Sequence, residues 1–221
     1  MKNNILLLLF FFVFNFTASQ DLKLPSIFSD NMILQQESVV SIWGWSKSNS
    51  QVSINVSWNK KTLKVKSDSE GKWLLKVKTP KSGKSHQMSF QSNNKRVVIS
   101  NILMGEVWIA SGQSNMQMNL DGYRNEPVLG ANDAIANSDN SEIRFFTVER
   151  NTSNIPLENL EGKWSVSSPE NSPFFSAVAY SFAKYLNTVL DDPVAIIHTS
   201  WGGTPAEAWS DSKSLQIDFE K

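Results

Sequence analysis

The chain has no cysteine among its 221 residues. Disulfide bonds, zinc-thiolate sites and a thiol nucleophile are therefore excluded. Basic and acidic side chains balance, 21 against 21, so no net charge favours nucleic acid or an anionic membrane surface as a partner. Histidine is also scarce, because His86 and His198 are the only two. A reaction that needs a histidine base must use one of these or a group from elsewhere.

Long apolar runs are absent except near the N-terminus, where one extends over residues 5–16. Lys2 precedes this run and the small residues 17–19 follow it. A charged start, a short apolar segment and small residues predict a secretory signal peptide over residues 1–20. The alternative is a permanent membrane anchor, which the run is too short to form comfortably. We therefore expect an exported protein, secreted or periplasmic, that leaves the membrane after cleavage.

Residues 21–103 are expected to form an antiparallel β-sandwich. Apolar and polar side chains alternate in short segments, as at Val52, Ile54 and Val56, and turn sequences separate the segments. The predicted strands are 38–45, 51–58, 62–67, 72–78, 86–92 and 96–103. The tryptophans of this part are expected at its core or rim: Trp43, Trp45, Trp58 and Trp73.

Residues 104–221 are expected to form part of an α/β domain, with the boundary near residues 102–105. Compact apolar strands are predicted at 106–111, 142–148 and 193–200, and a weak helix at 131–138. A stronger helix is predicted to begin at Ser172 and Pro173 and to end before residues 191–193. Strands that alternate with helices indicate a parallel sheet. The apolar face of the stronger helix is expected to comprise Phe174, Val178, Phe182, Tyr185, Leu186 and Val189.

Two segments that follow predicted strands carry candidate catalytic residues. "GEVWIASGQSNMQM" (105–118) contains Ser114, and "WGGTPAEAW" (201–209) contains a Gly-Gly pair. The carboxyl ends of parallel strands form the ligand-binding edge of such a sheet, and glycine lets backbone amides approach a substrate oxygen. Ser114 is therefore a candidate nucleophile. The alternative is an ordinary helix cap, since Met116 stands where a Gly-x-Ser-x-Gly elbow has its second glycine.

These two segments resemble the sialate O-acetylesterase family, carbohydrate esterases of the wider SGNH hydrolase group. Residues 24–36, 40–45, 68–77 and 173–186 also resemble that family. The resemblance implies a β-sandwich followed by an SGNH-type, flavodoxin-like parallel sheet domain. It implies a serine esterase that removes O-acetyl groups from sugars or glycans and needs no metal or cofactor.

The resemblance also implies roles for individual residues. Ser114 attacks the acetyl carbonyl, and its backbone N–H helps to hold the oxyanion together with a glycine amide from Gly202–Gly203. Gln113 and Asn115 flank the nucleophile and shape the pocket. Glu207 and Trp209 match family positions without an assigned role.

The family's base lies in an Asp-x-x-His block near the C-terminus, after a block similar to "QGESN". This sequence contains neither block, and neither histidine has an aspartate three residues before it. His86 is expected at the surface or rim of the β-rich part. His198 is the alternative base, although a histidine within an apolar strand more often packs or forms hydrogen bonds. We therefore expect a C-terminally truncated family member with an incomplete sheet and little activity by itself.

Two other hypotheses stay open. Residues 21–103 could be a non-catalytic carbohydrate-binding module, or the chain could be a degenerate member that keeps the motifs without turnover. The sequence identifies neither the acetylated sugar nor an oligomeric state. Arg124, Arg144 and Arg150 are candidates for binding a sugar carboxylate by charge alone, and solvated surface arginines are the simpler interpretation.

Overall fold

A computed structural model describes residues 22–210, 213 and 215. The predicted signal peptide lies outside the described residues. The strands are β1 (Ile33–Gln35), β2 (Val39–Trp45), β3 (Gln51–Val56), β4 (Asn59–Lys66), β5 (Lys72–Lys78), β6 (His86–Ser92), β7 (Lys95–Gly112), β8 (Asn140–Val148), β9 (Gly162–Ser167) and β10 (Val194–Ser200). The α-helices are α1 (Ser114–Gln117), α2 (Ala131–Ala136) and α3 (Ala177–Leu190), and the 3-10 helices are η1 (Ser172–Phe174) and η2 (Ala206–Trp209).

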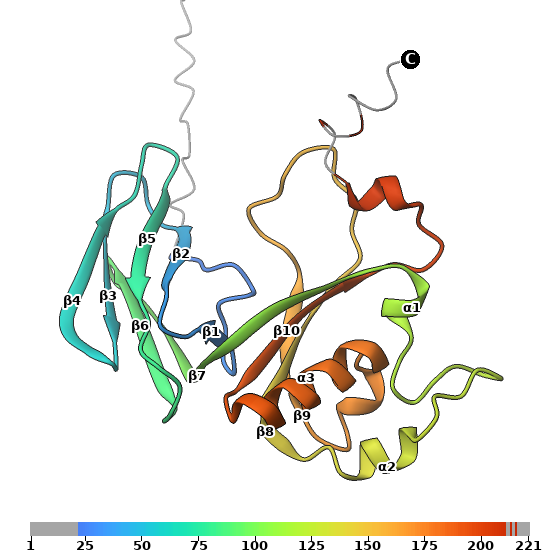
Figure 1. Cartoon of the computed structure of the whole chain (residues 1–221). Helices are drawn as coiled ribbons and strands as arrows, with labels where there is room; N and C mark the ends of the chain where they lie inside the picture. The colour runs from blue at the N-terminus through green and yellow to red at the C-terminus, as the bar shows by residue number, and fades with distance from the viewer. Residues whose placement is uncertain (1–21, 211–212, 214, 216–221) are drawn as a thin grey trace, which may run out of the picture.

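The chain is a mixed α/β protein with two sheets (Figure 1). The larger sheet has the order β4-β3-β6-β7-β10-β8-β9, and β1 also pairs with β7. Its first strands are antiparallel, whereas β7, β10 and β8 run parallel and β9 closes that end antiparallel. Strands β2 and β5 form the separate two-stranded sheet. The predicted parallel arrangement is confirmed, and β9 is a strand that the sequence analysis missed.

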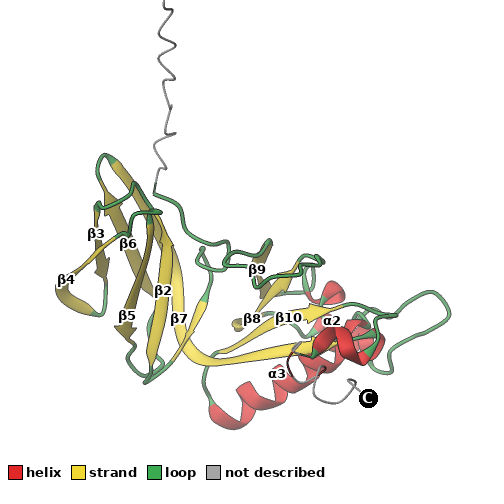
Figure 2. Ribbon diagram, turned by 90° about the horizontal axis from the view of Figure 1, so that it is seen from above, coloured by secondary structure: helices red, strands yellow, loops and turns green. Residues whose placement is uncertain are grey.

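Strand β7 joins the two parts of the molecule without a linker. The sequence analysis predicted two strands, 96–103 and 106–111, whereas the structure has one continuous strand over Lys95–Gly112. Its first half pairs with β6 and its second half with β10, so the strand curves from one part into the other (Figure 2). Gly105 lies where the change occurs, and its missing side chain leaves room for the Pro193 carbonyl, which accepts from the Glu106 N–H at 2.8 Å.

Gly105→Ala is expected to destabilise the fold strongly. A Cβ at this position would lie 2.0 Å from the Pro193 carbonyl oxygen, and backbone cannot rotate away as a side chain can. We expect a loss of about 3 kcal/mol or more in the free energy of unfolding, at or above the upper end for overpacked sites. Urea unfolding measures it, with the exposed β7 variant Ser111→Ala as the control. Equal unfolding midpoints for the two variants would show that β7 and β10 do not meet this closely.

Helix α3 starts later than the sequence predicted. Ser172 and Pro173 lie in the separate turn η1, and Phe175 is extended, with φ −78° and ψ 150°. Ser176 is the N-cap of α3, and its side chain accepts from the Ala179 N–H at 3.2 Å. The predicted start was wrong because the turn that begins at Ser172 stops after three residues, whereas the turn that Ser176 caps continues as a helix.

The predicted apolar face of α3 is also wrong, except at Leu186, which is partly buried against the core. The buried residues of the helix are Ala177, Ala179, Tyr180 and Ala183. The other predicted side chains are exposed in the described structure: Phe174, which belongs to η1, and Val178, Phe182, Tyr185 and Val189 of the helix. Small residues allow α3 to approach the parallel strands closely, so the helix packs through its smaller face.

Two hydrophobic clusters form the core of the described residues. The first contains Ile42 and Trp73 from the small sheet together with Val52 and Phe90 from the large one. The second lies under α3, where Phe145 stacks on Phe175 at a centroid distance of 4.1 Å. None of the described helices combines the length and apolar character that a membrane crossing requires.

Candidate active site

Ser114 lies at the point where β7 ends and the short helix α1 begins. Its side chain is exposed, and its Oγ forms no hydrogen bond within the part of the chain that the structure describes. The N-cap position of α1 belongs to Gln113, and no side chain caps the helix. The capping role considered for Ser114 is therefore not seen. Because α1 has four residues, the helix dipole can contribute little at the serine.

The Gly-Gly turn after β10 packs directly against the Ser114 turn. Parallel pairing of β7 and β10 brings Ser200 opposite Gly112, and the Trp201 N–H then donates to the Gly112 carbonyl at 3.0 Å. A Cβ on Gly202 would lie 3.1 Å from Ser114 Oγ, so a side chain at this position would crowd the hydroxyl. The fold thus brings together two of the segments that the sequence analysis selected.

Hydrogen bonds fix the Gly-Gly turn to α1. The Gly202 N–H donates to Gln117 Oε1 at 2.5 Å, and Gln113 Nε2 donates to the Thr204 carbonyl at 2.6 Å. The sequence analysis did not select Gln117, although its position three residues after Ser114 places both on one side of the helix. Gln117 therefore occupies one of the two glycine amides that were expected to face an oxyanion.

Gly203 and Asn115 remain open toward solvent. The Gly203 amide forms no hydrogen bond among the described residues, and its φ of +80° lies in the left-handed region that favours glycine. Asn115 is exposed on α1. Of the two predicted glycine donors, Gly203 is the one that this geometry leaves available to a substrate oxygen.

Neither histidine is hydrogen-bonded to Ser114. His198 is buried on β10, and its Nε2 lies 2.8 Å from Ser200 Oγ and 3.2 Å from the Met116 carbonyl oxygen. Its Nδ1 is buried without a partner among the described residues, so no carboxylate orients the ring. His198 therefore fastens β10 to α1, which agrees with the packing role expected for a histidine in that strand.

His86 belongs to the other part of the molecule and is buried, contrary to the surface or rim position predicted for it. Its Nδ1 lies 3.0 Å from Ser57 Oγ, and its ring meets Trp58 edge-on at a centroid distance of 5.2 Å. The indole packs against the imidazole and shields part of it from solvent. His86 is thus a packing residue.

Stability is expected to fall as the pH drops below about 6.5, the ordinary histidine pKa. Burial lowers the pKa of His198, opposed by the Met116 carbonyl and assisted by Arg150, and burial also lowers the pKa of His86. A lowered pKa means that the unfolded chain binds more protons just below that pH, so acid favours unfolding. Urea unfolding at pH 8 and pH 5.5 tests this. His198→Gln should reduce the difference, and an unchanged difference in both His198→Gln and His86→Gln would contradict it.

Arg144 is not a surface arginine, as the simpler interpretation held. It is 1% exposed, and its guanidinium donates to the carbonyl oxygens of Asn31 and Asn101 at 2.9 and 2.6 Å. Desolvation lowers its pKa to about 10, opposed by the charge of Glu142. Arg144 thus links β8 to the loop before β1 and to β7, which is a structural role.

Arg150 lies beside the Gly-Gly turn. Its guanidinium carbon is 5.9 Å from the Trp201 ring centroid, a cation–π contact. Both residues line a cavity of about 600 Å³ that also includes Trp209, whose Nε1 donates to Thr204 Oγ1 at 2.8 Å. Ser114 does not line this cavity. Among the described residues, no group of three or more His, Asp or Glu side chains is placed to hold a metal ion.

The chain is similar to known proteins over most of its length. No family model matches the chain. The sialate O-acetylesterase of Homo sapiens is 29% identical over 218 residues, which are 90% of this chain and 41% of that protein. The sialate O-acetylesterase of Mus musculus is 30% identical over 217 residues, 90% of this chain and 39% of that protein.

A solved structure is similar as well. The crystal structure of a carbohydrate acetylesterase from Xanthomonas citri superposes with a TM-score of 0.82 and 30% identity, over 88% of this chain and 44% of that one. The chain spans about two fifths of the length of the curated relatives it matches. Within that span, the chain is similar to the sialate O-acetylesterases at about 29% identity.

Proposed function

We propose that the chain supplies the nucleophile and part of the oxyanion site of a carbohydrate O-acetylesterase. The closeness of Ser114 to the Gly202–Gly203 turn carries this proposal: a Cβ on Gly202 would lie 3.1 Å from Ser114 Oγ, and the neighbouring Gly203 amide forms no hydrogen bond among the described residues. The resemblance of both segments to the sialate O-acetylesterases supports it, as do the similar proteins.

In the proposed reaction, Ser114 Oγ attacks the acetyl carbonyl carbon while its proton passes to a base. The N–H groups of Ser114 and Gly203 would stabilise the oxyanion of the tetrahedral intermediate. The protonated base then gives its proton to the sugar oxygen, which leaves as a hydroxyl group. In the second half of the reaction the base takes a proton from water, and the water oxygen attacks the acetyl-serine and releases acetate. Gln117 keeps the Gly-Gly turn in place by holding the Gly202 N–H.

We propose that the base comes from outside these 221 residues. Histidine is the base of a Ser-His-Asp triad, and the two histidines of this chain are buried in contacts with Ser57, Ser200 and the Met116 carbonyl and form no hydrogen bond to Ser114. A second polypeptide or further sequence with an Asp-x-x-His block would supply it.

The proposed substrate is an O-acetylated sugar or glycan. Arg150, Trp201 and Trp209 line the cavity next to the Gly-Gly turn, where aromatic surface could pack against a sugar ring and the guanidinium against an acidic substituent. Sialate is named in the sequence relatives and carbohydrate in the structural one. Nothing in the proposed mechanism requires nucleic acid, a metal or a cofactor.

The finer fold assignment and the location belong to the same proposal. We take residues 21–103 as a small antiparallel sandwich, supported by a core shared between the β2–β5 sheet and β3–β6, and residues 104–221 as part of an SGNH-type, flavodoxin-like domain. We also propose export to the periplasm or exterior through cleavage near Ser19–Gln20, without later membrane attachment. N-terminal sequencing of the exported protein checks the cleavage.

Complementation tests the proposed function. The chain would be co-expressed with the part of the Xanthomonas citri acetylesterase that it does not match, and the pair is called the assembled protein below. We expect acetate release from 9-O-acetylated sialic acid or from acetylated neutral glycans, and none from either half alone. A soluble assembled protein that binds these glycans but releases no acetate would favour the non-catalytic alternative.

A further inference from the structure

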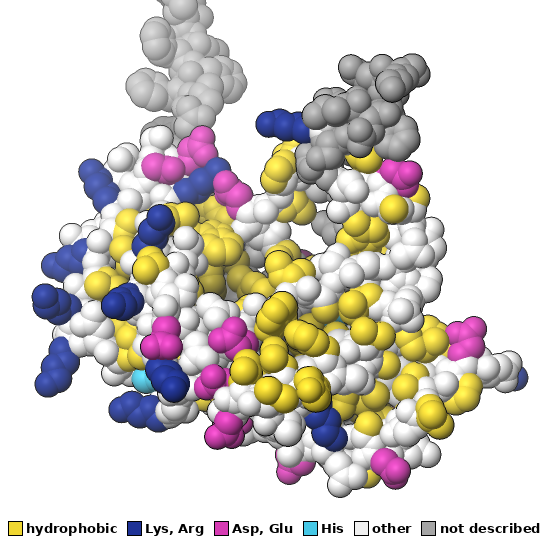
Figure 3. All heavy atoms as spheres, in the orientation of Figure 1, with side chains coloured by type: hydrophobic (Ala, Val, Ile, Leu, Met, Phe, Trp, Pro, Cys, Tyr) yellow, Lys and Arg dark blue, Asp and Glu magenta, His cyan; other side chains and the backbone are white. Residues whose placement is uncertain are grey.

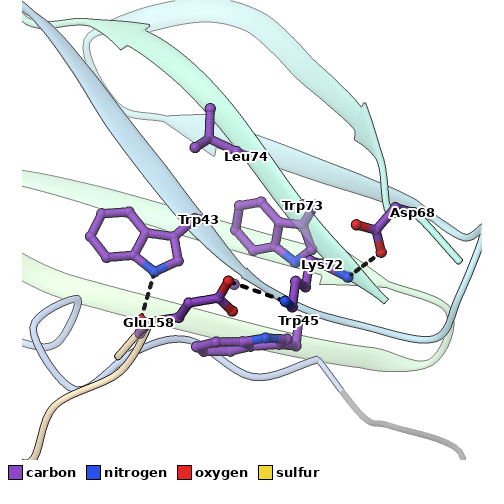
Figure 4. Close-up of a pocket in the computed structure, with 8 residues that line it drawn as sticks. Trp43, Trp45, Asp68, Lys72, Trp73, Leu74 and Glu158 are labelled. Carbon is purple, nitrogen blue, oxygen red and sulfur yellow. Dashed lines mark hydrogen bonds and ion pairs between the residues drawn. The ribbon is translucent and has the colours of Figure 1, made fainter. Parts of the chain in front are cut away.

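A second hollow lies far from Ser114, on the face of the β2–β5 sheet. It has a volume of about 410 Å³, and its apolar lining residues include Trp43, Trp45, Trp73 and Leu74. Figure 3 shows apolar side chains gathered in a depression beside charged ones, and Figure 4 shows the lining residues. We call this feature the tryptophan hollow. Its volume is in the range that accepts small ligands.

Part of the apolar surface of the hollow does not pack against other side chains of the core. Trp45 is half-buried and belongs to neither hydrophobic cluster of the described residues, and Leu74 is 56% exposed on β5. Trp43 differs, because it packs edge-on against Phe28 at 4.6 Å and donates from Nε1 to the Glu158 carbonyl at 3.0 Å. Trp45 and Leu74 therefore offer a surface for a ligand, while Trp43 fixes one wall.

The indole N–H of Trp73 lacks a partner. Trp73 is 3% exposed and lines the hollow, and its Nε1 forms no hydrogen bond among the described residues. The indoles of Trp58 and Trp164 do have partners, since Trp58 donates to the Lys78 carbonyl at 2.9 Å and Trp164 to the Ile27 carbonyl at 2.8 Å. Buried donors are rarely left unpaired, because each costs about 1–3 kcal/mol. An acceptor brought by a ligand would satisfy Trp73 once the side chains that line the hollow shift enough to admit it, because the Nε1 atom is itself buried.

The charged groups at the hollow favour a neutral, hydroxyl-rich ligand. Lys72 Nζ lies 3.1 Å from Glu158 Oε1 and 3.2 Å from Glu70 Oε2, so its charge is already matched by two carboxylates. Asp68 adds a third carboxylate and uses Oδ1 for two backbone N–H groups. The excess of acceptors can take hydrogen bonds from hydroxyl groups, and the excess of negative charge repels an anion.

We propose that the tryptophan hollow binds one ring of a neutral sugar, separately from the esterase site. The ring packs on Trp45 and Leu74, a ring or hydroxyl oxygen accepts from Trp73 Nε1, and hydroxyl groups donate to Asp68 and Glu158. An acidic sugar would place its carboxylate among these acceptors. The inference does not depend on Ser114 and concerns the β-rich part of the chain.

Indole resonances in the NMR spectrum of the ¹⁵N-labelled chain test the proposal. Xylobiose, cellobiose, maltose, lactose and mannobiose would each be added at about 10 mM, since a shallow site is expected to bind with a Kd near 1 mM. We expect at least one of them to shift the signals of Trp45 and Trp73, assigned by Trp→Phe changes. N-acetylneuraminic acid and galacturonic acid should shift them at least about tenfold more weakly.

Variants separate binding at the hollow from other contacts. Trp45→Ala and the milder Leu74→Ala should each weaken the titration, Trp45→Ala by about tenfold or more. Trp108→Ala removes a ring that is 45% exposed on β7 and does not line the hollow, so it should leave the titration unchanged. The remaining indole signals report whether each variant is folded. If Trp45→Ala is not folded, the titration of Leu74→Ala decides the test.

Three results would overturn the proposal. The first is no shift of Trp45 or Trp73 with any of the neutral sugars. The second is equal binding of the acidic sugars, and the third is shifts confined to Trp201 and Trp209, which would place the sugar at the esterase cavity.

Discussion

Replacing Ser114 by alanine is expected to lower acetate release by the assembled protein about 10³-fold or more, the scale seen when a serine hydrolase loses its nucleophile. The hydroxyl is the atom that forms the acetyl-enzyme, and no neighbouring group can replace it. Folding should be unaffected, because Ser114 is exposed and its Oγ forms no hydrogen bond within the described residues. Acetate release, measured at saturating substrate, checks the effect on kcat.

Two serine variants serve as controls for this loss. Ser111→Ala removes another exposed hydroxyl at the end of β7 and should leave the rate unchanged. Ser200→Ala removes the serine that lies 2.8 Å from His198 Nε2, the one Ser–His contact described in this part of the structure. If Ser200→Ala abolished activity while Ser114→Ala did not, the assignment of the nucleophile would be wrong.

The isolated 221-residue chain is expected to hydrolyse 4-nitrophenyl acetate at close to the background rate. A serine hydroxyl is a weak nucleophile until a base takes its proton, and general-base catalysis typically contributes about 10²–10⁴-fold. His198 cannot supply this help to Ser114 as it stands, because its Nε2 faces Ser200 and the Met116 carbonyl. Nitrophenol release by the wild-type chain and by Ser114→Ala should therefore be equal within error.

A fast reaction of the isolated chain that is lost in Ser114→Ala would contradict this expectation. His198→Gln then identifies the base, since it would lower the rate only if His198 turns toward Ser114. Retention of the fast rate in His198→Gln would point to a partner chain that copurifies.

The sequence predicted the parallel strands and the pairing of the two chemical segments because both depend on local patterns. Apolar runs predicted strands at the positions of β7, β8 and β10. Their parallel pairing places Ser114 and Gly202 at the same edge of the sheet, where the carboxyl ends of these strands lie. The continuity of β7 was not predictable from the local pattern, because a glycine within an apolar segment usually indicates the end of a strand. Gly105 instead leaves room for the carbonyl of Pro193, a residue that is distant in the sequence.

Helix α3 and the buried arginine show a second limit of sequence reasoning. Large apolar residues suggested the buried face, yet close packing on the sheet selects small ones such as Ala179 and Ala183. Arg144 reads as a solvated charge, and only the fold brings the carbonyls of Asn31 and Asn101 to its guanidinium. Tertiary contacts between distant segments decide both cases.

Covalent labelling with a fluorophosphonate, followed by peptide mass spectrometry, tests the central claim most directly. The claim is that Ser114 is the nucleophile and that its base comes from outside the chain. We predict that the label is found on Ser114 in the assembled protein and forms far more slowly on the isolated chain. Labelling of Ser200, or equally fast labelling of Ser114 without the second polypeptide, would contradict the claim.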